Sequence, residues 1–441
     1  MKREEASKIV RETFENPFDK TRFINFIINL LNLKAEQIEH KHPYSGKIIP
    51  DPYKQYISTL KRLAKYTDGE NKIDILIVHL KKETSIERAR TMQRNFIAWY
   101  LNGSRGNELK DAALVAFVSP NEEDWRFSLV KMEYRWAEDK NGRHKIKEHF
   151  TPARRWSFLV GKNENSHTAQ RQLVEIVEDD KTNPNLKQLE EAFNVETVTK
   201  EFFGKYKDLY EKIKKAIEKI INEDNIVQKE FADKVVNTDD FSKKLLGQIV
   251  FLYFLQKKGW FGVQRDKNWG TGPKNFLRQL FEKKHSDYNN FFNDILEPLF
   301  YEALATDRGE RAFYEKFKCR IPFLNGGLFE PINNYDWGKT DIILPNDLFS
   351  NRTKNDIEGS GVLDVFDLYN FTVREDEPLE KEVAIDPEML GKVFENLLSD
   401  NLRKGQGAYY TPREIVHYMC QESLINYQQQ NSLLILYLPL P

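Results

Sequence analysis

Short runs of β-branched and aromatic residues, each long enough for one strand, alternate with helical patterns in the first 175 residues. KIDILIVHLKK (72–82) and AALVAFVSP (112–120) are two such runs, and SIERARTMQRNFIAWYLN (85–102) lies between them with apolar residues at helical intervals. Two more runs, WRFSLVKMEY (125–134) and RWSFLVG (155–161), follow. This alternation places helices against a sheet, so residues 1–175 are predicted to form an α/β domain.

Residues 176–400 carry a different pattern, in which charged amphipathic helices alternate with polar loops. The most apolar segment is LLGQIVFLYFLQKKGW (245–260), and its two glutamines and closing Lys-Lys-Gly favour a buried core helix over a membrane span. Asp386-Pro387, before EMLGKVFENLL, supplies the N-cap residue and first-turn proline of a helix start. We predict a mainly α-helical connector domain over 176–400.

Charge and cysteine content limit the environment and the partners. The 67 basic and 68 acidic residues of this 441-residue chain nearly cancel, so contact with a polyanion must come from local basic patches. Cys319 and Cys420 lie far apart and form no CxxC pattern, which argues against a disulfide framework and a structural zinc site. The N-terminus lacks an apolar signal segment. A cytoplasmic protein without membrane contact is predicted.

The strand DILIVHLKK matches part of a metal-dependent nuclease pattern of the PD-(D/E)xK type. In that pattern carboxylates bind Mg²⁺, and a lysine two residues after an acid orients the attacking water. Asp74 would be the metal ligand and Lys81 the catalytic lysine. His79 occupies the position where the second acid is expected, and imidazole is a poor ligand for Mg²⁺.

Two interpretations of this strand stay open. In one, a relocated acid completes the metal site, with Glu36, Glu39 or Glu87 as candidates. In the other, the segment is an ordinary strand at the edge of a sheet, and Lys81 and Lys82 are solvated. The first interpretation predicts nuclease activity, and the second predicts no catalytic activity for this strand.

Basic clusters in the first 160 residues suit contacts with DNA phosphates. Arg88, Arg94 and the pair Arg154-Arg155 are the predicted DNA-binding residues, and KQYISTLKRLAKY (54–66) and NGRHKIK (141–147) add further cations. The alternative is a solvated charged surface without a ligand.

The segment GAYYTP begins another kind of structure. Gly407 allows a turn, Tyr409 and Tyr410 supply rings that stack or pack, and Thr411-Pro412 opens the helix REIVHYMCQESL. The free amides and the positive dipole at such a helix start suit a carboxylate.

The chain resembles the type IIG restriction–modification enzymes over roughly residues 45–427. GAYYTP resembles motif X of N6-adenine DNA methyltransferases of the amino-first order, which helps bind the methionine end of S-adenosylmethionine. The segments IPFLNGGLFEP, DVFDLYNFTVRED and IDPEMLGKVFENLL resemble the helical region before that motif, and DILIVHLKKETSIERARTMQRNF resembles the nuclease-like domain of the family. The family order is a nuclease-like domain, a helical connector, a methyltransferase and a DNA-specificity domain.

The resemblance implies a partner, cofactors and a role for the motif X residues. Double-stranded DNA would be the substrate, S-adenosylmethionine the methyl donor of the parent enzyme, and Mg²⁺ the cofactor of a nuclease. Gly407, Tyr409, Tyr410, Thr411 and Pro412 would contact S-adenosylmethionine. No segment resembles the DPACGSG-like cofactor loop or the NPPY-like adenine loop of the family, and both are needed for chemistry on a flipped base. Methylation is therefore not expected from this chain by itself.

The last residues suggest a boundary. Residues 401–427 read as the start of a methyltransferase domain. Residues 428–441 (QQQNSLLILYLPLP) no longer resemble one. The expectation is an N-terminal portion of a larger enzyme that stops just after motif X, with an aberrant tail. Two other functions stay open: a non-catalytic module that binds DNA or a separately encoded methyltransferase half, and an inert remnant.

Overall fold

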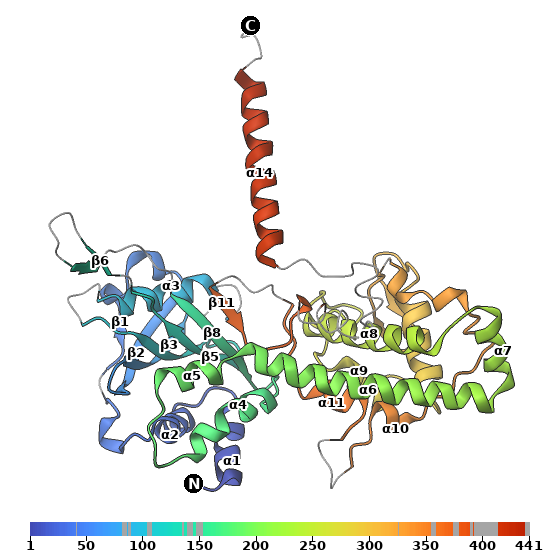
Figure 1. Cartoon of the computed structure of the whole chain (residues 1–441), viewed down its shortest axis with the longest axis horizontal. Helices are drawn as coiled ribbons and strands as arrows, with labels where there is room; N and C mark the ends of the chain where they lie inside the picture. The colour runs from blue at the N-terminus through green and yellow to red at the C-terminus, as the bar shows by residue number, and fades with distance from the viewer. Residues whose placement is uncertain are drawn as a thin grey trace. The chain divides into compact units, whose positions relative to one another are not determined.

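The computed structural model describes residues 1–40, 42–81, 86, 90–103, 108–134, 136–138, 144–146, 153–324, 326–353, 359–373, 379–388, 391 and 413–436. The chain divides into two compact units, Met1–Asp386 and Pro387–Pro441. Figure 1 shows the elements of both units.

A seven-stranded mixed sheet forms the centre of the N-terminal half of the first unit (Figure 1). Neighbouring strands follow the order β1-β2-β3-β4-β5-β8-β11. Their bounds are β1 Tyr44–Ser45, β2 Ile57–Thr67, β3 Lys72–Leu80, β4 Ala112–Val118, β5 Asp124–Lys131, β8 Arg154–Gly161 and β11 Glu380–Glu382.

Strand directions follow from the connections. β2 and β3 form an antiparallel hairpin, whereas β3 and β4 run parallel because helix α3 (Arg90–Leu101) connects them. β5 runs antiparallel to both β4 and β8. β11 then joins β8 in parallel, although more than 200 residues separate the two strands. The first residues of β3, β4 and β8 and the last residues of β2 and β5 thus lie at one end of the sheet, which we call the Asp74 end.

Helices cover both faces of the sheet (Figure 1). α1 (Arg3–Phe14), α2 (Lys20–Leu31) and α4 (His167–Glu178) pack together on one face, and α3 lies on the other. On the first face the Phe14 ring contacts the rings of Trp125 and Phe127, both at 5.6 Å between centroids. Strands β3, β4 and β5 are buried almost throughout, as their apolar runs predict.

The helical region of the first unit is built around α8 (Thr238–Lys257), which the sequence predicts as a buried core helix. Most of its apolar side chains are buried, and α6 (Val195–Glu223) packs along it. The other helices are α5 Leu186–Ala192, α7 Asn225–Asp233, α9 Phe276–Phe281, α10 Asn346–Phe349 and α11 Val362–Asp367. Along the described helices, none is long and apolar enough to cross a membrane.

Short elements complete the first unit. Two hairpins are formed by β6 Trp136–Glu138 with β7 His144–Ile146, and by β9 Phe313–Tyr314 with β10 Cys319–Arg320. The 3₁₀ turns are η1 Ala35–Gln37, η2 Gly46–Ile48, η3 Asp51–Tyr53, η6 Gly327–Phe329 and η7 Ile332–Asn334, and the π-helical segments are η4 Phe292–Leu296 and η5 Pro298–Ala303.

The second unit contains one long helix within its described part. α14 (Arg413–Leu436) begins directly after Pro412, where the sequence predicts a helix start. It then continues past Tyr427 to Leu436, so the helix is longer than the change in composition after Tyr427 suggests. Several apolar side chains on it are exposed, among them Ile415 and Leu424.

The predicted combination of an α/β layer with a helical region is confirmed. The sheet, however, takes strands from both sides of the predicted boundary at 175/176, because β11 comes from residues 380–382. The predicted boundary near residue 400 lies outside the described residues.

Candidate functional site

Asp74 lies near the start of β3, buried, at the Asp74 end of the sheet. Its carboxylate accepts a 2.6 Å hydrogen bond from the Tyr100 hydroxyl of α3. Two cations approach the same oxygen: Arg62 Nη1 of β2 at 3.6 Å and Lys110 Nζ, just before β4, at 3.7 Å. Three neighbouring elements therefore converge on one carboxylate.

Glu39 extends this group of charges through Arg62. Its carboxylate accepts a 2.8 Å hydrogen bond from Arg62 Nε, so one guanidinium bridges Glu39 and Asp74. Burial opposes the charged form of Arg62, but the bond to Glu39 and the negative charges nearby outweigh it and raise the Arg62 pKa. Burial and the Asp74 charge raise the pKa of Tyr100, which keeps its hydroxyl protonated as a donor.

Two cavities flank this cluster. One, of about 340 Å³, is lined by Asp74, Lys72 and Tyr66, and the other, of about 400 Å³, by Arg62, Trp99 and Tyr100 among others. Lys65 and Lys110 line both cavities. Lys65 is the cross-strand partner of Asp74, and it makes no ion pair with any residue that the structure describes.

The donor set around Asp74 does not fit Mg²⁺. A hard divalent cation takes several oxygen ligands, and here the carboxylates of Asp74 and Glu39 already face Arg62 and Lys110. Within the described ranges, no group of three or more His, Cys, Asp or Glu side chains is arranged to hold a metal ion. Glu36, another predicted acid, is exposed on η1, and Glu87 lies outside the described residues.

Lys81 lies at the opposite end of β3 from Asp74. The two positions are seven residues apart on an extended strand, which corresponds to roughly 23 Å at about 3.3 Å per residue. They also point to opposite faces of the sheet, because side chains alternate along a strand. His79 faces the α2 side, where its ring contacts Phe18 and its Nδ1 lies 3.2 Å from the Thr59 hydroxyl. The structure therefore does not bring Asp74 and Lys81 into one catalytic site.

Of the four arginines predicted to contact DNA, two lie in the interior. Arg155 of β8 binds Glu380 of β11 with an N–O distance of 3.0 Å, and Arg94 of α3 lies 3.6 Å from the same carboxylate. Burial lowers the pKa of Arg155 to about 9 despite the Glu380 charge. Both side chains are used to attach β11 to the sheet, so phosphate contact by them would require opening this cluster.

The same buried cluster contains a second carboxylate. Glu382 lies 3.1 Å from Arg126 Nη1 of β5 and 3.7 Å from Arg90 Nη1 of α3. Burial alone would raise the pKa of Glu382, but the two guanidinium groups outweigh it and lower that pKa. The cluster thus ties β5, β8, β11 and α3 together on the α3 face of the sheet.

Of the remaining predicted DNA-binding and cofactor-binding residues, only Arg154 lies within the described part of the chain. Arg154, the first residue of β8, is exposed at the Asp74 end of the sheet and pairs with Glu133 at 3.0 Å. Arg88 lies outside the described residues, as do the predicted cofactor-binding residues Gly407, Tyr409, Tyr410, Thr411 and Pro412.

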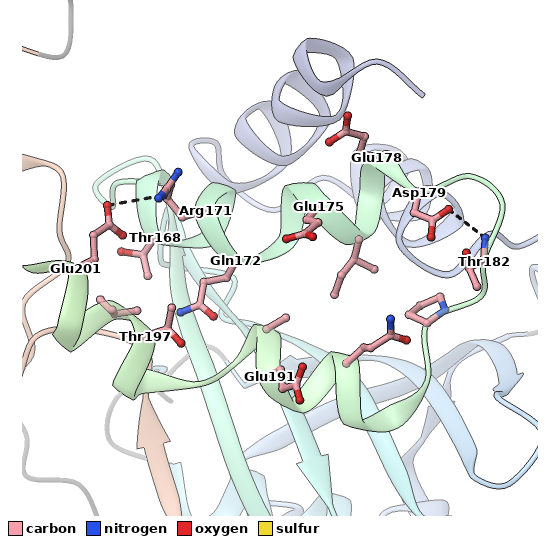
Figure 2. Close-up of a pocket in the computed structure, with 15 residues that line it drawn as sticks. Thr168, Arg171, Gln172, Glu175, Glu178, Asp179, Thr182, Glu191, Thr197 and Glu201 are labelled. Carbon is pink, nitrogen blue, oxygen red and sulfur yellow. Dashed lines mark hydrogen bonds and ion pairs between the residues drawn. The ribbon is translucent and has the colours of Figure 1, made fainter.

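A third cavity, of about 640 Å³, lies between α4 and the segment from α5 to the start of α6 (Figure 2). Its charged lining is mostly acidic, with Glu175 and Glu191 on facing helices. Glu201 pairs with Arg171 at 3.7 Å, as the dashed line in Figure 2 marks. Such a lining repels phosphate, so this cavity does not suit DNA.

Sequence patterns identify part of the Asp74 site. Asp74 is predicted as a metal ligand and Glu39 as a candidate second acid, and in the structure both carboxylates face Arg62. Tyr100 lies in the predicted helix 85–102, but helical spacing alone does not distinguish a buried ring from a hydroxyl donor. Arg62 and Lys110 are missed, since nothing in the sequence shows which cation lies opposite Asp74.

Comparison with known proteins gives a partial relationship. No protein-family model matches the chain, and no solved structure matches it. A protein of Methanocaldococcus jannaschii, provisionally named a type II restriction enzyme and methyltransferase, is 34% identical to this chain over 201 residues. The matched segment covers 43% of this chain and 15% of that protein, so the chain spans a small part of the relative's length.

Proposed function

We propose that this chain is the DNA-directed portion of a type II restriction–modification protein. The observation that carries the proposal is the 34% identity over 201 residues to a protein named a restriction enzyme and methyltransferase. The resemblance of roughly residues 45–427 to type IIG enzymes also supports it. In this proposal the Asp74 end of the sheet, where Arg154 is exposed, contacts double-stranded DNA, and the helical region connects the sheet to a methyltransferase.

For the whole protein, the proposed reaction is methylation of adenine N6 with S-adenosylmethionine as the methyl donor. The residues from Gly407 to Pro412 would contact the methionine end of that cofactor. Because the adenine-binding loop has no counterpart in this sequence, methyl transfer is assigned to the complete enzyme and not to this chain alone.

DNA binding without cleavage is the activity proposed for the chain itself. The Asp74 carboxylate is neutralised by neighbouring cations and does not fit Mg²⁺, so no hydrolytic step is assigned to it. Arg154 is exposed and is therefore proposed to contact the phosphate backbone, with its Glu133 pair replaced by the phosphate.

The test is binding of the purified full chain to a short fluorescent duplex at increasing salt. Affinity should fall steeply between roughly 50 and 200 mM salt, because each neutralised phosphate releases counterions. Arg154→Gln should weaken binding and reduce the salt slope by about one. Lys229→Gln is the matched control, since Lys229 is exposed on α7 without an ion pair to a described residue.

Incubation of plasmid DNA with the purified full chain and Mg²⁺ or Mn²⁺ tests whether the chain cleaves DNA. No cleavage is expected. Cleavage that Lys81→Ala abolishes would restore the nuclease interpretation. Failure to bind duplex at low salt would overturn the proposed function itself.

A second candidate function is binding of a separately encoded methyltransferase half. The exposed apolar side chains of α14 favour it, because exposed apolar residues along one helix are typical of protein interfaces. Co-purification with the candidate partner, lost in Ile415→Lys or Leu424→Lys, is the expected result. Partner capture that both variants leave intact would contradict this role for α14.

A further inference from the structure

The lining residues of the 400 Å³ cavity beside Asp74 are of two chemical kinds, which we call the aromatic wall and the cationic wall. One wall is apolar and aromatic, with Tyr44, Ile49, Phe96 and Trp99 among its residues. The other is cationic, formed by Arg62, Lys65 and Lys110. A ligand suited to such a lining carries both a flat apolar group and a negative charge.

The aromatic wall is held in place by neighbouring rings. Trp99 stacks on Phe96 with centroids 5.6 Å apart and planes 22° apart, and Tyr53 contacts both rings. Tyr44 comes from β1, where its backbone pairs with Leu60 of β2. Tyr44 and Trp99 are only half-buried, so ring surface remains accessible for stacking on a planar ligand.

Of the three cations in the cationic wall, Arg62 and Lys110 pair with described carboxylates and Lys65 does not. Arg62 is occupied by Glu39 and Asp74. The Glu108 carboxylate pairs with Lys72 and also interacts electrostatically with Lys110 and Lys65. Lys65 is exposed, lines the cavity and makes no ion pair with a described residue. Lys110 is buried, with Nζ 3.7 Å from Asp74 and 5.3 Å from the centre of the Tyr100 ring.

We propose that this cavity binds one nucleotide, with the base against Tyr44 and Trp99 and the phosphate at Lys65 and Lys110. A volume of about 400 Å³ lies within the range of small-ligand pockets, roughly 300–1,000 Å³, and is too small for a segment of duplex. The inference rests on the proposed function for the source of the ligand, which is the unpaired terminal nucleotide of a DNA strand. A free nucleotide has the same chemistry.

Calorimetric titration of the full chain separates these sources. The probes are the four 2′-deoxynucleoside 5′-monophosphates, a 5′-phosphorylated single-stranded oligonucleotide, the same oligonucleotide without its phosphate, and a blunt duplex. Binding of the phosphorylated single strand is expected to exceed that of the unphosphorylated strand. Lys65→Gln should weaken it by about tenfold or more, because a hydrogen bond to a charged group is lost. Trp99→Leu should also weaken it, through lost stacking, and the Lys229→Gln control should not.

Each outcome separates this inference from the proposed function. Monophosphates that bind with the same dependence on Lys65 and Trp99, while DNA strands do not bind, support the site and assign it to free nucleotides. Duplex binding that persists while no nucleotide or single strand binds overturns the inference and leaves the proposed function intact. Nucleotide binding that neither variant weakens also overturns it. If Arg154→Gln loses duplex binding while nucleotide binding is unchanged, the result bears on the proposed function and not on this cavity.

Discussion

Arg155 and Glu380 form a fully buried ion pair at 3.0 Å, although 225 residues separate them in the sequence. The pair attaches β11 to β8 at the edge of the sheet, and the amide of Arg155 also donates to the Leu379 carbonyl. A three-residue strand of sequence Glu-Lys-Glu has little intrinsic tendency to form a sheet. Its position therefore depends on the arginines that surround its carboxylates.

Glu380→Gln should destabilise the first unit by about 3–5 kcal/mol, because it leaves Arg155 buried without its countercharge. The free energy of unfolding in denaturant measures the effect. Glu133→Gln, which breaks the exposed pair with Arg154, is the control and should cost no more than about 1 kcal/mol. Equal losses in the two variants would show that the buried pair contributes no more than a surface pair.

Tyr100→Phe should lower the free energy of unfolding by about 1.5–3 kcal/mol, because Asp74 loses a hydrogen-bond donor in a buried site. Tyr53→Phe provides the comparison, since the Tyr53 hydroxyl donates only to the exposed Asn95 carbonyl at 3.2 Å. A smaller loss in Tyr100→Phe than in Tyr53→Phe would contradict the assigned role of Asp74 as the centre of the cluster.

The lowered pKa of Asp68 predicts that the protein loses stability in acid. Burial opposes its charge, but backbone amides of Asn71, Leu186 and Glu70 outweigh it and lower its pKa to about 2. Because the folded pKa is below the unfolded value, the stabilisation is present above about pH 4 and disappears as the pH falls towards 2. After allowance for solvent screening it amounts to about 1 kcal/mol.

Comparing the wild type with Asp68→Asn between pH 6 and pH 2 measures this contribution. The difference in free energy of unfolding should shrink as the pH falls below about 4. A constant difference for Asp68→Asn would contradict the prediction.

Mg²⁺ should leave thermal stability unchanged. A ligand that binds only the folded state raises the melting temperature by mass action, and the charge-neutralised Asp74 cluster offers no such site. Melting curves with MgCl₂ and with EDTA should therefore coincide. A rise with Mg²⁺ that Asp74→Asn removes would mean that the cation displaces Arg62 and Lys110.

The sequence predicts the buried strands of the sheet better than its edges. β3, β4 and β5 are found within a few residues, because runs of β-branched and aromatic side chains determine them locally. β2 reads as a basic and aromatic cluster, since its lysines and arginines conceal the alternation of buried residues. β11 is missed, because its pairing depends on charges supplied from distant segments.

The candidate site is predicted in part for a similar reason. Asp74 is recognised by its residue type and its place in a strand. Its pairing with Lys81 is not formed, since a motif shows the order of residues but not which end of the strand each one occupies. Arg94 and Arg155 read as DNA contacts because a cationic residue in a sequence looks the same whether its partner is a phosphate or a buried glutamate.

The late position of β11 has a consequence for protein synthesis. At roughly 5–20 residues per second, the ribosome adds Glu380 roughly 10–50 s after Arg155. Throughout that interval β8 has an unpaired edge, and Arg155 lacks its acidic partner. Nascent chains stalled within this stretch would therefore expose a strand edge able to pair with other polypeptides.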